Sequence, residues 1–120
     1  MTAVNTSKRS KKTRFIKLKG TVAFPGEASG KALLLGDVSK KIKKEGFILV
    51  AEATYPEYLP LMLKSNGIVT EVGGILSHAA IVAREFKITC VVGVKDVTSR
   101  IRTGDKVIIK KDGVVLAESR

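Results

Sequence analysis

The chain of 120 residues contains a single cysteine, Cys90, and a single histidine, His78. One cysteine excludes an internal disulfide framework and a zinc site built on cysteines. Cys90 lies in the apolar run of residues 88–92, where we expect it to pack as a small buried hydrophobic residue. No run approaches the roughly 18 apolar residues of a membrane span. No apolar secretory segment follows the start, so a cytoplasmic protein is expected.

Acidic residues are missing from the first 20 positions, and aromatic residues are missing before Phe15. Residues 1–20 therefore carry a charge of +7, whereas the other hundred residues carry 15 basic and 11 acidic residues, or +4. We expect residues 1–13 to be a disordered basic leader, because a Ser/Thr/Lys-rich segment cannot bury a core. The lack of aromatic residues argues against specific binding of single-stranded nucleic acid. A solubilising tail and an arm for an acidic partner remain open.

The sequence also lacks two features of enzymes that use nucleotides: a phosphate-binding loop and a carboxylate cluster for magnesium. It contains no G-x-x-x-x-G-K-[ST] phosphate loop. Its carboxylates at Glu52, Glu57 and Glu71 are scattered and do not predict a magnesium site. We therefore expect no metal site and no resident cofactor, and no turnover of ATP or phosphoenolpyruvate by this chain alone.

Residues 14–120 are long enough, and with 44% apolar residues apolar enough, to fold as one domain. The middle of the chain alternates buried strand patterns with helical patterns, which predicts parallel strands joined by right-handed crossovers. The flanks have the patterns of antiparallel strands, including a hairpin through residues 111–113. The prediction is an α/β fold of mixed β/β/α architecture, with strands near residues 14–19, 21–24, 31–35, 47–51, 68–70, 89–92, 106–110 and 114–117, helices near 56–63 and after 77, and a surface segment at 37–44.

The stretch TEVGGILSHAAIVARE, residues 70–85, places the only histidine at the start of a helix. Ser77 is a suitable N-cap, since its hydroxyl can accept a hydrogen bond from a free amide of the first turn. Leu76 and Ile81 occupy the positions of a hydrophobic staple. The expected buried stripe of the helix consists of Ile81, Val82 and Phe86.

His78, as the first helical residue, lies among unpaired amides at the positive end of the helix dipole. That field disfavours the charged imidazole by roughly 0.3–1 kcal/mol. It favours the neutral ring, which is a nucleophile, and it favours a bound anion. Gly73 and Gly74 offer backbone without side chains, so that a phosphate donor can approach closely. On these residues alone the pattern is a weak signal, and a structural or surface histidine beside a tight turn is the favoured interpretation.

The wider pattern resembles the phosphohistidine signature of phosphoenolpyruvate-utilising enzymes, which include phosphoenolpyruvate synthase, pyruvate phosphate dikinase, enzyme I of the sugar phosphotransferase system and rifampicin phosphotransferase. The resemblance covers about residues 18–118. Its matched positions in the signature are Thr70, Gly73, Gly74, Ser77, His78, Ala79, Ala80, Ile81, Ala83 and Arg84. It continues upstream through residues 46–50, Thr54 and Pro56 and downstream through residues 91–93 and 104–105.

The resemblance implies a mobile swivelling domain whose histidine carries a phosphoryl group on Nε2. His78 would be that residue, with Gly73, Gly74, Ser77 and the Ala79 amide around the phosphate. Thr70 would orient either the loop or the imidazole. Arg84 falls off the histidine's helical face, and a structural role is favoured over phosphate binding.

Two residues depart from the family pattern. Thr89 replaces the usual proline, which affects the following strand rather than the chemistry. Leu76 replaces a threonine that is the regulatory phosphorylation site in plant dikinases, so that form of control is excluded.

The expected function is that of a phosphoryl carrier. It would accept the group from ATP or phosphoenolpyruvate, with magnesium, at a partner ATP-grasp domain or phosphoenolpyruvate-binding barrel. Two alternatives stay open. The fold could be a binding module that uses its basic arm, or a regulator that competes with the carrier domain of a complete enzyme.

Overall fold

The computed structural model describes residues 15–37 and 45–119. The expected leader, and all of the expected surface segment except Asp37, lie outside the described residues. In chain order the elements are β1 (Phe15–Lys19), β2 (Thr21–Phe24), β3 (Ala28–Leu34), η1 (Leu35–Asp37), β4 (Ile48–Ala51), η2 (Pro56–Tyr58), α2 (Leu59–Leu63), β5 (Gly67–Thr70), α3 (His78–Phe86), β6 (Thr89–Val92), α4 (Val97–Arg100), β7 (Lys106–Ile109) and β8 (Val114–Glu118).

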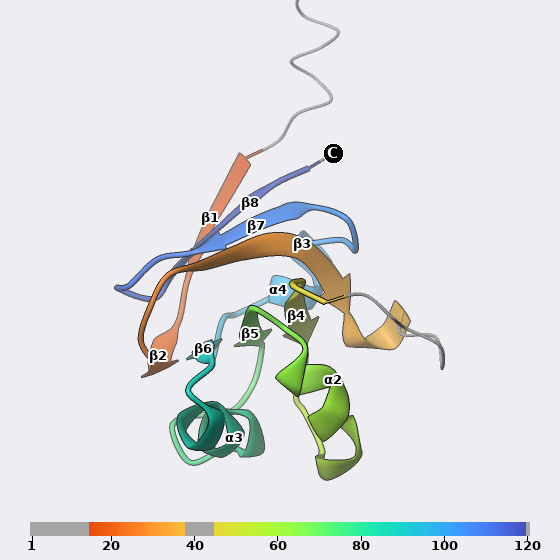
Figure 1. Cartoon of the computed structure of the whole chain (residues 1–120). Helices are drawn as coiled ribbons and strands as arrows, with labels where there is room; N and C mark the ends of the chain where they lie inside the picture. The colour runs from red at the N-terminus through yellow and green to blue at the C-terminus, as the bar shows by residue number, and fades with distance from the viewer. Residues whose placement is uncertain (1–14, 38–44, 120) are drawn as a thin grey trace, which may run out of the picture.

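The strands are hydrogen-bonded in the order β1-β8-β7-β3-β4-β5-β6-β2. β3, β4, β5 and β6 pair in parallel, and the pairs β1–β8, β7–β8, β3–β7 and β2–β6 are antiparallel. The strand β3 belongs to both halves: residues 28–31 pair with β7, and residues 32–34 pair with β4. The chain thereby passes from one β layer into the other within a single strand, as Figure 1 shows.

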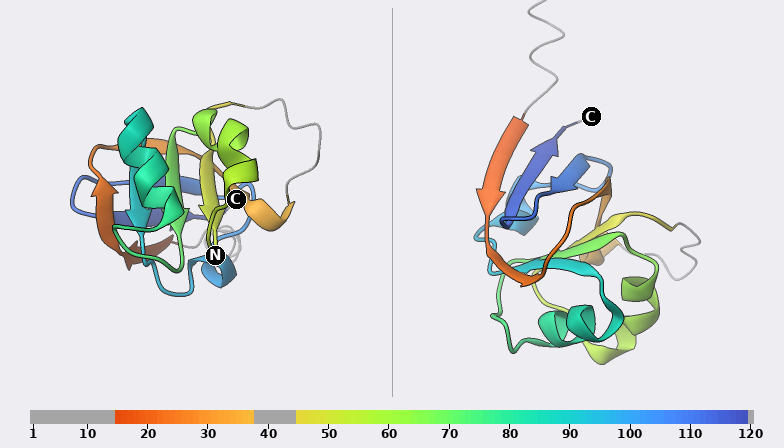
Figure 2. Two further views of the ribbon diagram at one scale, coloured as in Figure 1. Left: turned by 90° about the horizontal axis from the view of Figure 1, so that it is seen from below. Right: turned by 60° about the vertical axis from the view of Figure 1, so that its left-hand side comes forward.

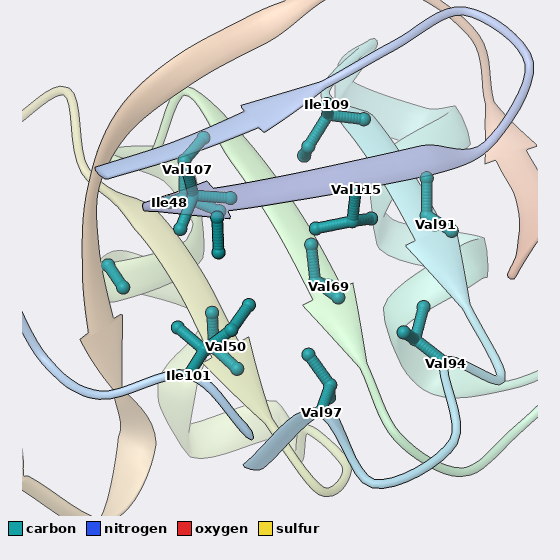
Figure 3. Close-up of a cluster of buried hydrophobic side chains, with 12 residues drawn as sticks. Ile48, Val50, Val69, Val91, Val94, Val97, Ile101, Val107, Ile109 and Val115 are labelled. Carbon is teal, nitrogen blue, oxygen red and sulfur yellow. The ribbon is translucent and has the colours of Figure 1, made fainter. Parts of the chain in front are cut away.

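The two β layers enclose one apolar core (Figure 3). Side chains of β4, β5 and β6 at alternate positions, including Ile48, Val50 and Val69, face Val107 and Ile109 of β7. Further members of this core come from β8 and from the segment around α4, among them Val94, Val97, Ile101 and Val115. Alternation with a period of two places every second residue of a strand on one face, so the parallel strands use half their side chains here.

The other face of the parallel strands is covered by α2 and α3, which lie below it in Figure 1 and in front of it in the left view of Figure 2. Leu49, Ile68 and Cys90 point to this face and pack with Met62 of α2 and with Ala79, Ala80, Val82 and Ala83 of α3. Both faces of β4 and β5 are therefore covered, which explains their unbroken apolar sequences. The mixed β/β/α architecture expected from the sequence is confirmed.

The helical segment expected near residues 56–63 is present and consists of a 3-10 turn, η2, followed directly by a short helix, α2. The expected buried stripe of α3 was wrong at two of its three residues, Ile81 and Phe86. The buried face of α3 consists of Ala79, Ala80, Val82 and Ala83, whereas Ile81 is 51% exposed and Phe86 is 47% exposed. Because α3 is apolar almost all round, its pattern does not specify the buried side. The small side chains let the helix approach β2 and β6 closely, and this packing decides which side is buried.

Candidate functional site

The histidine of the quoted stretch lies at the edge of the parallel sheet where β4 and β5 end. Loops that follow parallel strands meet at this edge, which is where sites form in open α/β sheets. The loop after β5 leads into α3, whose first residue is His78. The imidazole is partly exposed, so a second molecule can reach it.

A threonine from the loop after β4 holds one nitrogen of this imidazole. Thr54 Oγ1 lies 2.9 Å from His78 Nδ1, and the direction of donation depends on the ring tautomer. Thr54 is only 4% exposed, so its hydroxyl cannot turn freely into solvent. No hydrogen bond to Nε2 is found among the described residues, and Nε2 is therefore the nitrogen available for chemistry.

The start of α3 is capped as the sequence predicts. Ser77 is the N-cap, and its Oγ accepts a 3.4 Å hydrogen bond from the amide of Ala80. The same hydroxyl donates to the Gly74 carbonyl at 2.7 Å, and the Ser77 amide donates to that carbonyl at 3.0 Å. Within the described part of the chain, no acceptor pairs with the amides of His78 and Ala79. These two amides are consequently free for an anion, whereas the Ser77 hydroxyl is already engaged.

Of the two glycines before the helix, only Gly73 is required by the local structure. Gly73 has a φ of +107°, and a Cβ placed there would lie 2.9 Å from the Cβ of Ser77. Its backbone conformation and its neighbour both exclude a side chain. Gly74 has no positive φ, and a Cβ added there would meet nothing within 4 Å. The fold of this chain alone does not require a glycine at position 74.

The loop that carries the glycines is fixed on two sides. On one side, the amide of Val72 donates to the carbonyl of Glu52 at 3.0 Å. On the other, Glu71 Oε1 accepts from the Thr98 hydroxyl at 2.6 Å and from the Thr98 amide at 3.0 Å. These donors favour the ionised carboxylate and hold the pKa of Glu71 below its ordinary value of 4.5. The carboxylate thus joins the loop after β5 to the start of α4.

Thr70 acts on the loop. From the sequence, Thr70 could contact either the loop or the imidazole. In the structure, its Oγ1 donates a hydrogen bond to the Val72 carbonyl at 3.1 Å. The contact with the imidazole belongs to Thr54 instead.

Arg84 lies at the opposite end of α3 from His78. Six residues separate the two, which corresponds to roughly 9 Å along the helix axis. Arg84 is exposed and occupies the last turn, where a cation interacts favourably with the helix dipole. Cys90 is fully buried, and burial raises the pKa of its thiol to about 12 despite the opposing charge of Arg84.

No group of three or more His, Cys, Asp or Glu side chains in residues 15–37 and 45–119 could hold a metal ion. None of the described helices is long and apolar enough to cross a membrane.

Thr54 is the site residue that sequence reasoning missed. The family pattern includes it as one matched position, with no role at the histidine. The sequence places this polar residue just beyond the end of β4, but its burial and its position beside the strand that precedes His78 come from the tertiary structure. The link between Glu71 and Thr98 had no comparable signal, because 27 residues separate the two.

Comparison with known proteins shows the family to which the chain belongs. Residues 43–113 match the family described as "PEP-utilising enzyme, mobile domain". The chain is 48% identical over 88 residues to the phosphoenolpyruvate synthase of Pyrococcus furiosus, covering 72% of this chain and 11% of that protein. It is 39% identical over 90 residues to the rifampicin phosphotransferase of Streptomyces sviceus, covering 75% of this chain and 10% of that protein. The chain thus spans about a tenth of the length of these curated relatives.

Solved structures give the same fold. Enzyme I matches with a TM-score of 0.57 and 34% identity, over 67% of this chain and 34% of that one. The aconitase X of Thermococcus kodakaraensis matches with a TM-score of 0.63 at 22% identity, over 85% of this chain and 98% of that one, which is a likeness of fold alone. Taken with the family match and the identity to phosphoenolpyruvate synthases, these findings show that the chain belongs to the mobile domains of phosphoenolpyruvate-utilising enzymes.

Proposed function

We propose that the chain is a phosphoryl carrier that accepts a phosphoryl group on Nε2 of His78 and delivers it to a second site. The observation that supports this most strongly is the contact of 2.9 Å between Thr54 Oγ1 and His78 Nδ1. An imidazole held through Nδ1 directs Nε2 outward, and the ring is partly exposed at a helix N-terminus.

The reaction uses the tautomer in which Nδ1 carries the proton and donates it to Thr54 Oγ1. The lone pair of Nε2 then forms a bond to phosphorus while the bond from phosphorus to the leaving oxygen breaks. The amides of His78 and Ala79, which have no acceptor among the described residues, and the backbone of Gly73 and Gly74 would receive the phosphoryl oxygens. A helix N-terminus stabilises such an anion by roughly 0.3–1 kcal/mol at an exposed site, and by more where the site is partly buried.

The donor belongs to other domains or subunits. ATP or phosphoenolpyruvate, with magnesium, would bind to an ATP-grasp domain and a phosphoenolpyruvate-binding barrel outside this chain. The small share of its relatives that the chain covers supports such a division of labour. The carrier would move between the two sites, and weak interfaces are what such movement requires.

Phosphoramidate provides a direct test, because this small donor phosphorylates reactive histidines without a partner enzyme. We expect an acid-labile, base-stable increment of one phosphoryl group in the wild-type chain, with the phosphorus on Nε2 by NMR. The His78→Ala variant, checked for folding by circular dichroism, should acquire none. A label that persists in His78→Ala, or its complete absence from the wild type, would contradict the proposal.

A further inference from the structure

Four large apolar side chains are exposed next to His78. Val72 is 48% exposed, Ile75 55%, Leu76 81% and Ile81 51%, and we name these four residues the apolar collar. The hydrogen bond from the Ser77 amide to the Gly74 carbonyl closes a turn with Ile75 and Leu76 at its centre, so both side chains project from its tip. Ile81 lies one helical turn after His78, on the same side of α3.

The segment that contains the collar also lacks charged side chains. Residues 72–83 contain no Lys, Arg, Asp or Glu, although these types make up 28% of the chain. An exposed group of large apolar side chains is costly to keep in water and commonly marks a surface that another protein covers. Half of the eight exposed large hydrophobic residues of the described chain fall within residues 72–81, which concentrates such a surface around the histidine.

Gly74 leaves room for a close approach to the backbone. Neither its φ nor any neighbour within 4 Å requires a glycine. A side chain there would extend into open space directly before the turn of the collar. The missing side chain keeps the backbone accessible to the phosphoryl group and to the surface that brings it.

The charge of the phosphoryl group indicates what the partner must provide. The group carries close to two negative charges. Free amides at the start of α3 offset part of this charge, and Arg84 lies at the far end of the helix. The collar supplies no cation, so a covering surface that carries one would complement the charge of the phosphoryl group.

We infer that the apolar collar is the docking surface of the carrier. The surface that covers it is a hollow phosphoryl-donor site on another domain or subunit. The rim of that site is apolar and packs on the collar, and its floor carries a lysine or arginine. The inference rests on the proposed function of His78. It adds a surface that decides how well the carrier docks without changing the reactivity of the imidazole.

The test measures docking and imidazole reactivity separately. The intact phosphoenolpyruvate synthase of Pyrococcus furiosus, supplied with 32P-labelled phosphoenolpyruvate, serves as the donor enzyme. The label entering this chain, which gel electrophoresis separates by its mass of 12.9 kDa, is followed against chain concentration. Each variant is labelled in parallel with phosphoramidate, which needs no docking.

The decisive variant is Leu76→Gln, which removes apolar surface and adds no charge beside the phosphoryl group. Its matched control is Leu63→Gln, on a leucine that is 46% exposed at the end of α2. We expect Leu76→Gln to lower the efficiency of enzymatic labelling about tenfold or more, as expected for losing a buried leucine at an interface. Leu63→Gln should change it less than twofold, and phosphoramidate labelling should stay unchanged in both.

A second pair of variants tests the close approach. Gly74→Ala should slow enzymatic labelling while leaving the unfolding midpoint unchanged. Gly36→Ala is the control, since a Cβ there also meets nothing within 4 Å and its φ is not positive. It should alter neither quantity.

The outcomes separate the two proposals. Equal enzymatic labelling of Leu76→Gln and the wild type would overturn the docking role alone. Loss of phosphoramidate labelling in Leu76→Gln would also overturn it, because the residue would then act on His78 itself. Concentration-dependent dimers that disappear in Leu76→Gln would identify a second copy as the occupant, against the inference. If phosphoramidate labels the wild-type chain but the enzyme does not, the result would contradict the relay and the docking role together.

Discussion

At the scale of single residues, one hydroxyl determines how the only histidine presents its two nitrogens. Thr54 is 4% exposed, and its Oγ1 lies 2.9 Å from His78 Nδ1. A hydrogen bond between two side chains is worth about 0.5–1.5 kcal/mol net, enough to bias both the rotamer and the tautomer of the ring. In the proposed reaction Thr54 is a positioning residue, because it contacts the imidazole and not the phosphoryl group.

The change Thr54→Val keeps the shape of the side chain and removes the hydroxyl. We expect phosphoramidate labelling of His78 to slow by about two- to tenfold, in proportion to the free energy of the lost hydrogen bond. Nitrogen-15 NMR of the imidazole should show a smaller share of the tautomer protonated at Nδ1. Thr54→Ser retains the hydroxyl, so its labelling rate and its tautomer population should match those of the wild type. An unchanged tautomer population in Thr54→Val would show that the contact does not orient the ring.

At the scale of elements, the site depends on a loop that is fixed between two neighbours. The loop after β5 is hydrogen-bonded to the end of β4 through Val72 and Glu52, and to α4 through Glu71 and Thr98. Val94, which follows β6, also donates its amide to the Thr70 carbonyl at 2.9 Å. A loop held at these points presents the start of α3 in one orientation, which reduces the entropy lost when a phosphate binds.

The Glu71 carboxylate gives this link a defined pH dependence. Its pKa is lowered in the folded protein, since the Thr98 hydroxyl and amide donate to the ionised form. The stabilisation is therefore present above the ordinary pKa of 4.5 and is lost as the pH falls through the lower folded value.

Urea denaturation of the wild type and of Glu71→Gln should accordingly show a difference in unfolding free energy near neutral pH. That difference should shrink as the pH falls below about 4.5. A carbon-13 NMR titration of the wild type should place the Glu71 pKa below 4.5. Glu85→Gln, on an exposed carboxylate of α3, is the matched control for the loss of one surface charge. A titration at or above the ordinary value would refute the link.

At the scale of the whole molecule, the site lies on the helical side of a three-layer arrangement. The antiparallel strands cover one face of β4, β5 and β6, and the helices cover the other (Figures 1 and 2). The core between the β layers therefore supports the parallel strands from behind the site (Figure 3). Its contribution should appear in global stability.

The neighbouring isoleucines of β7 test this arrangement. Ile109 is fully buried between the β layers, whereas Ile108 points to the opposite face and is half-buried. Ile109→Ala should lower the free energy of unfolding by about 2–5 kcal/mol, because the β layers cannot close fully over the cavity. Ile108→Ala, which removes the same atoms, should cost clearly less. Equal urea midpoints for the two variants would show that the strand does not face the core as described.

The amino-acid sequence by itself determined the features that depend on a few neighbouring residues. Ser77 caps the helix that begins at His78, since the cap hydrogen bond joins residues three apart. The unbroken apolar sequences of β4 and β5 indicated strands covered on both faces. The family signature predicted the type of fold, which is confirmed, and it singled out His78 as the candidate site residue.

Only the tertiary structure decided which distant groups meet. The contact of Thr54 with His78 spans 24 residues, and that of Glu71 with Thr98 spans 27. Both depend on the register of neighbouring strands, which no local pattern encodes. The buried side of α3 was likewise set by close packing on β2 and β6, because an apolar helix has no preferred side until a neighbour restricts the size of its side chains. That choice left Ile81, the one member of the apolar collar that lies on α3, exposed.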